Sequence, residues 1–378
     1  MATRVVIAGV STRAAAASAA NAGFVVTAVD AFGDLDQHPS VRSLSVPRDF
    51  GVRFTASAAA RVARDIACDA VAYLSSFENH PRAVATLAAG RALWGNTPDV
   101  LRRVRDPFLF AGRLRRQGFA TPITRVDVTS EATDWIVKPF RSGGGQGVRR
   151  WLPGVRVPIG HYAQERIDGV PASIVFVAGN GRAVPLGLSY QLIGDEACGA
   201  SGYRYCGNVL APADDPILNP TVSSSAADLA RHAAAEFSLV GLNGIDLIIR
   251  DGTAYAIEIN PRWSASMELV ERAYGVSMFG IHADACVNGV LPAFDLMEAR
   301  RRAGAAGKAI VFAQEALTAG ATHRWLDDET VRDIPNPGER IAAGQPICTV
   351  FDEDTDVERC LAALRRRARS IESAISAP

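Results

Sequence analysis

Short apolar runs alternate with alanine-rich stretches in the first 95 residues of the chain. The pattern predicts strands at 4–9, 24–29 and 69–74, with helices at 12–22 and 81–90. Units of strand, helix and strand usually place parallel strands side by side, with helices on the faces of the sheet. We therefore expect a small doubly wound α/β domain at the N-terminus.

The pattern changes after residue 95, where two helices are predicted within 95–122. Short β segments follow, at 134–139, 148–152, 163–168, 172–178 and 182–193. Residues 194–220 are rich in Gly, Asp, Pro and Asn, and we expect long loops there, which in compact domains are often functional.

The second half of the chain begins with a helix predicted at 221–238, capped by one of Ser223 to Ser225. Strands at 244–250 and 253–259 are joined by Asp251-Gly252, a dipeptide typical of tight hairpin turns. An Ala/Arg-rich helix is predicted at 292–307. Further strands are expected within 308–351, before a basic helix that closes the chain.

The composition is that of a globular protein without a strong charge. The chain has 378 residues, 48% of them hydrophobic, and 40 Lys+Arg against 40 Asp+Glu. This balance gives no support for a nucleic acid or an anionic membrane as partner. No segment has the features of a signal peptide or a membrane span, so we expect a cytoplasmic enzyme acting on small molecules.

The cysteines show no metal-binding spacing. None of the six forms a CxxC pair, so a zinc site is not predicted, and reduced thiols are expected. They are Cys68, Cys198, Cys206, Cys286, Cys348 and Cys360.

A glycine-rich loop follows the strand predicted at 134–139. The segment 137–147 reads VKPFRSGGGQG, with Lys138 at the end of the strand. Consecutive glycines let backbone amides approach phosphate oxygens, and a lysine adds a compact positive charge. The lysine precedes the glycines and a strand follows them, so the loop is neither a Walker A loop nor a dinucleotide fingerprint. Phosphate binding is our interpretation, and a flexible hairpin turn is the alternative.

Oxygen-bearing side chains are predicted to converge on the hairpin at 244–259. Side chains alternate along a strand, so Glu258 and Asn260 should share a face, with Ile257 and Ile259 on the other. Asp246 can lie opposite that face, and such a set suits Mg²⁺. Arg262 follows in Asn260-Pro261-Arg262 and can bind an anion in the same space. A hairpin with an ordinary polar face is the alternative, but it explains the Asn-Pro-Arg continuation poorly.

These two motifs, in this order, resemble the ATP-grasp superfamily, in particular the branch of biotin carboxylase and carboxylate–amine ligases. The resemblance implies an α/β protein, α+β overall, with a Rossmann-like N-terminal domain (1–100) and a lid with the glycine loop (101–167). A catalytic core (168–305) and a β-rich C-terminal extension (306–378) would complete it.

The resemblance also assigns roles to particular residues. Lys138 would contact the ATP phosphates, and Arg262 would lie near the γ-phosphate and the acyl intermediate. Mg²⁺, with Mn²⁺ as the alternative ion, would be held by Asp246, Glu258 and Asn260. The phosphates would be covered by a loop that includes Ser142, Gly143, Gly144, Gly145 and Gly147.

The segment Gln164 to Asp168 resembles the hinge that cradles adenine in this family. Glu165 and Ile167 would then meet the base, Asp168 would approach the ribose, and Arg166 would be a cofactor-binding residue of the same segment; an ordinary strand and turn is the alternative. Many relatives have an ATP-contacting Lys in a turn where this chain has Arg105-Asp106-Pro107. Either Arg105 substitutes for that Lys, or the contact is lost.

Three segments are candidates for the substrate side of the site. Residues 75–79 (SSFEN) resemble a signature of poorly characterised ATP-grasp proteins from methanogens and methylotrophs, and Glu78 could bind an amine. An acidic residue at a helix N-terminus is the alternative for Glu78. Arg13, after the first strand, could hold an anionic group, and the loop at 203–208 is the third candidate.

The resemblance implies a ligase that forms an acyl phosphate with Mg-ATP and then an amide bond between a carboxylate and an amine. A role in the biosynthesis of a one-carbon cofactor, of the methanofuran or tetrahydromethanopterin type, is the pathway it suggests. A carboxylase acting through carboxyphosphate and a non-catalytic ATP-binding regulatory protein are the alternatives. A homodimer is left open.

Overall fold

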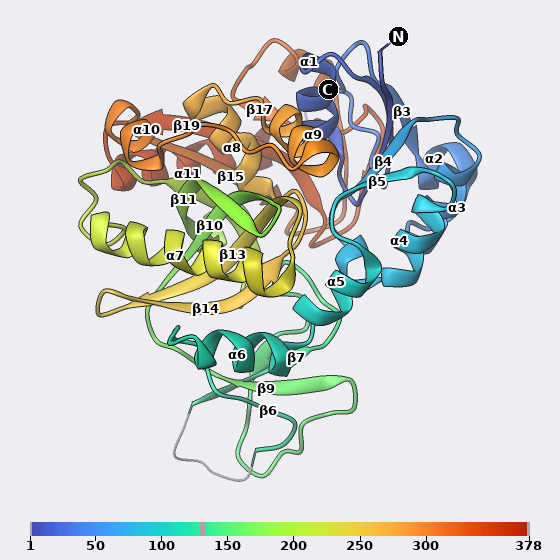
Figure 1. The fold of residues 1–378 in the computed structure, drawn as a ribbon. Helices are drawn as coiled ribbons and strands as arrows, with labels where there is room; N and C mark the ends of the chain where they lie inside the picture. The colour runs from blue at the N-terminus through green and yellow to red at the C-terminus, as the bar shows by residue number, and fades with distance from the viewer. Residues whose placement is uncertain (1, 129–133, 376–378) are drawn as a thin grey trace.

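A parallel sheet of five strands forms the N-terminal part of the computed structural model, which describes residues 2–128 and 134–375. The strand order is β3-β2-β1-β4-β5, and Figure 1 shows this part of the chain in blue to cyan. The strands are β1 (Arg4–Ala8), β2 (Val25–Asp30), β3 (Arg42–Ser45), β4 (Ala70–Tyr73) and β5 (Ala92–Trp94). The helices are α1 (Arg13–Asn21), α2 (Val46–Phe50), α3 (Ala56–Arg64) and α4 (Pro81–Ala88), with a 3-10 turn η1 (Phe77–Asn79).

Apolar residues cover both faces of this sheet. Alanines of α1 pack with Val5 and Ile7 on one face, whereas α3 and α4 pack with Val6 and Val71 on the other. Consecutive residues of one strand therefore point to opposite cores, which is why these strands read as continuous apolar runs. The expected doubly wound arrangement is observed.

A small antiparallel sheet lies at the bottom of the view in Figure 1, below helix α6 (Pro107–Arg116). Its order is β6-β9-β7-β8. The strands are β6 (Thr124–Arg125), β7 (Trp135–Pro139), β8 (Arg149–Arg150) and β9 (His161–Glu165). Helix α5 (Pro98–Val104) leads into α6 from the N-terminal sheet.

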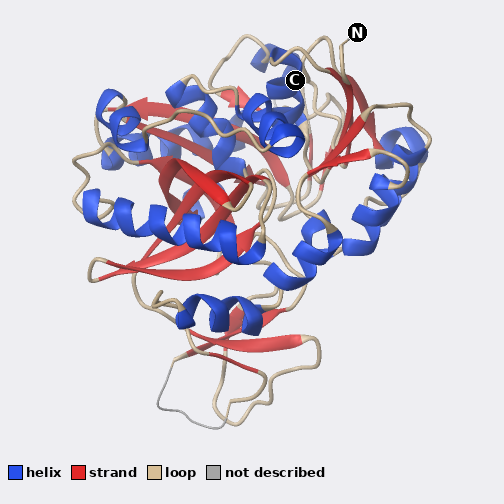
Figure 2. Ribbon diagram, in the orientation of Figure 1, coloured by secondary structure: helices blue, strands red, loops and turns tan. Residues whose placement is uncertain are grey.

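The largest sheet has eight strands in the order β14-β13-β10-β11-β12-β15-β19-β17, and its neighbours are antiparallel. Figure 2 colours the strands red and the helices packed around them blue. The strands are β10 (Val170–Gly179), β11 (Arg182–Ile193), β12 (Tyr205–Leu210), β13 (Gly241–Arg250), β14 (Thr253–Asn260), β15 (Ala305–Phe312), β17 (Val331–Arg332) and β19 (Pro346–Asp354). The helices are α7 (Pro220–Phe237), α8 (Ala265–Tyr274), α9 (Met278–Asn288), α10 (Leu296–Arg302) and α11 (Val357–Ala374). The short elements are η2 (Glu196–Cys198), η3 (Thr322–Trp325) and the pair β16 (Leu317–Thr318) and β18 (Arg340–Ile341).

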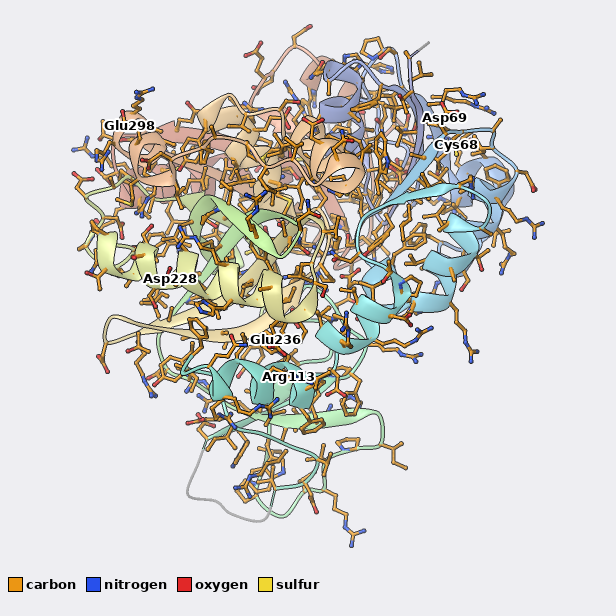
Figure 3. All side chains as sticks on the ribbon, in the orientation of Figure 1. Cys68, Asp69, Arg113, Asp228, Glu236 and Glu298 are labelled. Carbon is orange, nitrogen blue, oxygen red and sulfur yellow. The ribbon has the colours of Figure 1, made fainter. Side chains whose placement is uncertain are left out.

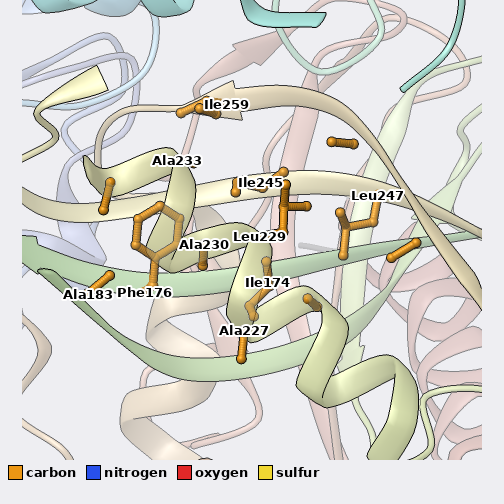
Figure 4. Packing of buried hydrophobic residues seen from close by; sticks show 14 of the residues in the cluster. Ile174, Phe176, Ala183, Ala227, Leu229, Ala230, Ala233, Ile245, Leu247 and Ile259 are labelled. Atoms are coloured by element: carbon orange, nitrogen blue, oxygen red, sulfur yellow. The ribbon is translucent and has the colours of Figure 1, made fainter. Parts of the chain in front are cut away.

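Helix α7 packs its apolar side on one face of the large sheet. Leu229 and Ala230 of the helix meet Ile174, Ile245 and other strand residues in one buried cluster (Figure 4). Helix α6 is tied to α7 at the surface by an ion pair of 2.9 Å between Arg113 and Glu236 (Figure 3).

Several expected elements were placed wrongly. Residues 205–210, expected in a loop, form the buried strand β12, because its pairing with β11 and β15 outweighs the loop-like composition. Helix α7 is capped by Asn219, whose side chain accepts from the Val222 amide, and not by Ser223 to Ser225. The helix expected at 292–307 ends at Arg302, and β15 begins at Ala305.

Two β segments of the small sheet also differ from the prediction. The strand expected at 148–152 is reduced to the two residues of β8. The segment expected at 163–168 is β9, which ends at Glu165 and leaves residues 166–168 outside the strand. None of the helices described in the structure is long and apolar enough to cross a membrane, and all six cysteines are free.

Candidate functional site

A cavity of about 600 Å³ lies where the three sheets meet. The large sheet contributes strand residues such as Ser173 and Asn208, and the small sheet contributes Lys138 with the glycine loop. The N-terminal domain contributes residues of the β1 and β4 ends, such as Ser11 and Ser75. Ligands of open α/β sheets usually bind at the carboxyl ends of the strands, and both of these segments follow strand ends.

The hairpin of β13 and β14 turns at Asp251-Gly252, both with positive φ (50° and 73°), as expected for this dipeptide. Asp246 lies directly opposite Glu258, and both line the cavity together with Asn260. The prediction for Ile257 was wrong, because this side chain lines the cavity beside Glu258. The register shifts between Asp246 and Leu247, so Ile257 has no partner on β13 and strict alternation is lost there.

The two facing carboxylates of the hairpin have different environments. Burial, and then the charge of Glu258, raises the pKa of Asp246 to about 7. Burial alone would also raise the pKa of Glu258, but the charges of Arg105, Lys138 and Arg262 lower it. Asp246 also accepts a hydrogen bond of 2.8 Å from Gln191 Nε2 on β11.

Lys138 lies on β7 and points into the same cavity. Its side chain is buried, and Nζ donates to Gln164 Oε1 at 3.4 Å. Burial would lower the pKa of Lys138, but nearby Tyr162, Glu258 and Asp246 raise it, so the ammonium stays charged. The structure therefore places a buried positive charge near the two carboxylates.

The glycine loop lies against the loop at 203–205. The Tyr205 amide donates to Gly144 O at 3.1 Å. Gly145 has a φ of +76°, and a Cβ there would lie 1.7 Å from Tyr203 O, so no larger residue fits without movement. Ser142, Gly143 and Gly144 line the cavity with Gly145, whereas Gly147 packs on Pro139.

The predicted hinge also lines the cavity, from Gln164 to Gly169. Glu165 Oε2 accepts from the Ile123 amide at 3.0 Å, and Ile167 is buried. Arg166 pairs with Asp134 (3.0 Å) and with Asp168 (3.1 Å), so its charge is compensated at the cavity edge.

Arg105 connects the parts of the site. Its Nη1 donates to Glu258 Oε2 and Ile259 O, both at 3.3 Å. Its Nη2 donates to Ser142 O at 3.0 Å and to Asn79 Oδ1 at 3.1 Å. The guanidinium therefore links the hairpin, the glycine loop and the N-terminal domain, whereas Pro107 begins α6.

Arg262 is held by the N-terminal domain. Its Nε and Nη2 donate to Glu78 Oε1 at 3.1 and 2.8 Å, and Nη2 also donates to Asn260 Oδ1 at 3.0 Å. Glu78 is 2% exposed, does not line the cavity and uses one oxygen for both bonds. The observed partner of Glu78 is thus Arg262, and the expected contact of Glu78 with a substrate amine is not supported.

The other two substrate-side candidates differ in accessibility. Arg13 is buried and pairs with Glu268, Asp333 and Asp36 at 2.6, 2.9 and 3.5 Å, so its charge is compensated within the protein. Tyr203, Tyr205 and Asn208 line the cavity, whereas Arg204 turns away to donate to Gly344 O. The sequence did not indicate Gln191 and Lys308, which the strand order of the large sheet brings to the cavity, or Glu268, which lies on α8 over that sheet.

Comparisons with known proteins agree on one fold. Residues 104–266 match the family model described as the ATP-grasp domain. An uncharacterised protein of Methanocaldococcus jannaschii is 25% identical over 276 residues, which cover 69% of this chain and 63% of that protein. The chain thus spans less than two thirds of that relative.

Two solved structures illustrate the shared architecture. The L-amino acid ligase from Bacillus licheniformis aligns with a TM-score of 0.71 at 18% identity, over 96% of both chains. The biotin carboxylase domain of the Hydrogenobacter thermophilus 2-oxoglutarate carboxylase, in complex with MgADP and bicarbonate, aligns with a TM-score of 0.70 at 14% identity. That alignment covers 97% of this chain and 89% of the other. At these identities the likeness establishes the fold alone.

Proposed function

The chain carries an ATP-grasp domain within an ATP-grasp fold, and from this premise we propose that it is an ATP-dependent carboxylate–amine ligase. One observation carries the proposal. Asp246 and Glu258 face each other in a cavity that also contains Lys138, the glycine loop and Arg262. Carboxylates for a divalent ion and cations for phosphate oxygens are the two requirements of phosphoryl transfer from ATP.

The donor set fits Mg²⁺. Asp246, Glu258 and Asn260 would hold the ion, and the pKa of Asp246 is raised by burial and by the charge of the facing Glu258, an environment that favours a divalent cation. Mn²⁺ prefers similar oxygen ligands and would serve as an alternative. When bound, the ion offsets charge on the ATP phosphates. The adenine would lie along Glu165 to Ile167, with Asp168 near the ribose, and Lys138 and the amides of 142–145 would hold the phosphates.

The chemistry proceeds in two steps. A substrate carboxylate oxygen attacks the γ-phosphorus of ATP, the bond to the β-phosphate oxygen breaks, and an acyl phosphate and ADP form. An amine then attacks the carbonyl carbon, phosphate leaves, and the nitrogen loses one proton to give the amide. Arg262 and Lys138 stabilise the negative charge on the transferring group, and the glycine loop excludes water from the acyl phosphate.

The glutamate at position 258 provides the direct test. Glu258→Gln keeps the shape of the side chain but removes the charge, and we expect ADP formation to fall by about 100-fold or more. Glu236→Gln, on the surface of α7 (Figure 3), is the matched control and should retain activity. Normal turnover of Glu258→Gln in the presence of Mg²⁺ would refute the metal assignment.

The reaction class is tested by what ADP formation requires. If the protein is a ligase, ADP formation requires both an acid and an amine. If ADP formation depends on bicarbonate, the protein is a carboxylase, and the absence of turnover would indicate a regulatory protein. A screen of amino acids and amines would also test the proposed role in one-carbon cofactor biosynthesis.

A further inference from the structure

Two side chains hold the start of the glycine loop by one backbone carbonyl. Ser142 O accepts a hydrogen bond of 3.0 Å from Arg105 Nη2 and one of 3.2 Å from Asn79 Nδ2. Arg105 Nη2 also donates to Asn79 Oδ1 at 3.1 Å, so the three groups form a closed ring of hydrogen bonds. Both side chains come from outside the loop, Asn79 from η1 of the N-terminal domain and Arg105 from the end of α5. The ring is shielded from solvent, since Asn79 is 8% exposed and the Arg105 side chain 12%.

The other carbonyl groups of the loop are engaged as well. Gly144 O accepts from the Tyr205 amide, and the carbonyls of Gly143 and Gly145 accept from amides later in the loop. In contrast, the amides of residues 142–145 donate to no backbone carbonyl in the part of the chain that the structure describes. All four residues line the cavity. Successive amides of this kind make an anion-binding concavity, so the loop is already shaped for phosphate oxygens.

Arg105 joins this loop to the hairpin of β13 and β14. Its Nη1 donates to Glu258 Oε2 and to Ile259 O, both at 3.3 Å, while Nη2 reaches Ser142 O. A guanidinium is planar and rigid, so its two terminal nitrogens fix the spacing between the groups that they bind. One side chain thus sets the position of the glycine loop relative to a proposed metal ligand.

Arg105 and Asn79 lie behind the wall of the candidate site. Neither of them lines the cavity of about 600 Å³. Arg105 instead lines a separate cavity of about 20 Å³, together with Pro107, Lys138 and Glu258. A space of that size holds about one water molecule and no nucleotide. Arg105 can therefore act on a bound nucleotide only through the loop and through Glu258.

We propose that Arg105 and Asn79 are positioning residues, which hold the glycine loop in register with Glu258 and so determine the affinity for the phosphates of ATP. The inference rests on the proposed ligase function, in which the loop amides and the metal ion meet the same phosphates. A loop that is held in advance loses less conformational entropy when its ligand binds. Of the two alternatives raised by the sequence at 105–107, a direct contact of Arg105 with ATP or the loss of that contact, the geometry favours the second.

Two ligands separate the phosphate contacts from the rest of the site. Binding of Mg-ATP is compared by isothermal titration calorimetry with binding of adenosine, which lacks the phosphates. Asn79→Leu keeps the size of the side chain but removes its donor and its acceptor, and we expect it to raise the Kd for Mg-ATP by about tenfold. The Kd for adenosine should stay within about twofold of the parent. An unchanged Kd for Mg-ATP, or equal losses for both ligands, overturns the inference.

Arg105→Lys distinguishes a positioning role from a counter-charge. If Arg105 served only to offset the charge of Glu258, with which it pairs at 3.3 Å, a lysine would suffice. One ammonium cannot hold Ser142 O and Glu258 in the two directions that the guanidinium holds, so we expect Arg105→Lys to weaken Mg-ATP binding by about tenfold. Arg103→Lys is the matched control, because Arg103 lies on the same helix and donates to Phe237 O. Full affinity for Mg-ATP in Arg105→Lys overturns the inference.

A readout without nucleotide examines the loop itself. Arg141 is exposed and precedes Ser142, and trypsin cleaves after arginine, so mass spectrometry reports how readily this loop opens. We expect cleavage after Arg141 to be about fivefold faster or more in Asn79→Leu and Arg105→Lys than in the parent, at similar unfolding midpoints in urea. Equal cleavage rates count against the positioning role alone. A parent that binds no Mg-ATP would instead overturn the proposed ligase function, and the inference with it.

Discussion

The ion pair between Glu78 and Arg262 is expected to fix the orientation of the Arg262 guanidinium. Glu78→Gln keeps the length of the side chain but removes the charge that faces the Arg262 guanidinium. Both bonds from Arg262 end on Glu78 Oε1, at 3.1 and 2.8 Å, and Glu78 is 2% exposed. In the variant the arginine would lose its buried counter-charge and adopt other orientations.

The expected loss in kcat of Glu78→Gln follows from the energy of hydrogen bonds to a charged group. Hydrogen bonds to a charged group contribute roughly 1.5–3 kcal/mol. We assume that the activation free energy rises by this amount when Arg262 is no longer held in its orientation. Since about 1.4 kcal/mol corresponds to a factor of ten, kcat should fall by roughly 10- to 150-fold. The Kd for Mg-ATP should change by less than about threefold, because Glu78 does not line the cavity.

Steady-state kinetics and nucleotide binding together give the assay. Glu78→Asp retains the charge but shortens the side chain, so it should recover part of kcat if position matters as well as charge. Glu271→Gln, which removes another partly buried carboxylate, on α8 and accepting from Ser18 Oγ, is the matched control because Glu271 does not line the cavity. A loss of Mg-ATP affinity as large as the loss in kcat would refute the positioning role, and so would a kcat within about twofold of the parent.

Two further predictions concern the lid and the fold. Gly145→Ala should lower Mg-ATP affinity by about tenfold or more, because its Cβ would collide with Tyr203 O. Gly143→Ala, where a Cβ meets nothing within 4 Å, should lose far less, and equal losses would contradict the packing argument. Burial lowers the pKa of His282 to about 4, so its neutral form stabilises the fold above the unfolded pKa of about 6.5 and this stabilisation is lost as pH falls. Between pH 7.5 and pH 5 this one group should lower the free energy of unfolding of the parent by about 2 kcal/mol, and His282→Asn should lack this contribution. Urea titrations at both pH values measure the change, and an equal fall in the free energy of unfolding of parent and variant would exclude the effect.

The motifs that could be predicted from the sequence depend on local geometry. A dipeptide such as Asp251-Gly252 fixes its own turn, and the strands on either side then bring Asp246 opposite Glu258. The glycine loop is likewise defined by its own residues and by the strand before it. Elements of this kind need no knowledge of distant partners, so their positions followed from spacing alone.

The parts that could not be predicted depend on partners far along the chain. Strand β12 contains Gly207 and follows a glycine-rich segment, and only its place between β11 and β15 makes it a strand. The bulge at Ile257 reflects a register shift against β13, which alternation cannot show. Lys308 meets Glu268 because α8 crosses over β15, and no local pattern indicates that contact.

The N-terminal domain holds the end of the hairpin of β13 and β14, which explains why the candidate site is built from all three sheets. Tyr73 Oη and Asn96 Nδ2 both donate to Pro261 O, at 3.2 and 3.1 Å, just before Arg262. Pro261, the residue after β14, is thus fixed by a domain that contributes no proposed metal ligand. Because buried hydrogen bonds at a strand end resist rotation of the backbone, the direction of Arg262 is set before any substrate binds. Pre-set direction of this kind is what the proposed stabilisation of a transferring phosphoryl group requires, since the charge of that group is redistributed over its oxygens in the transition state.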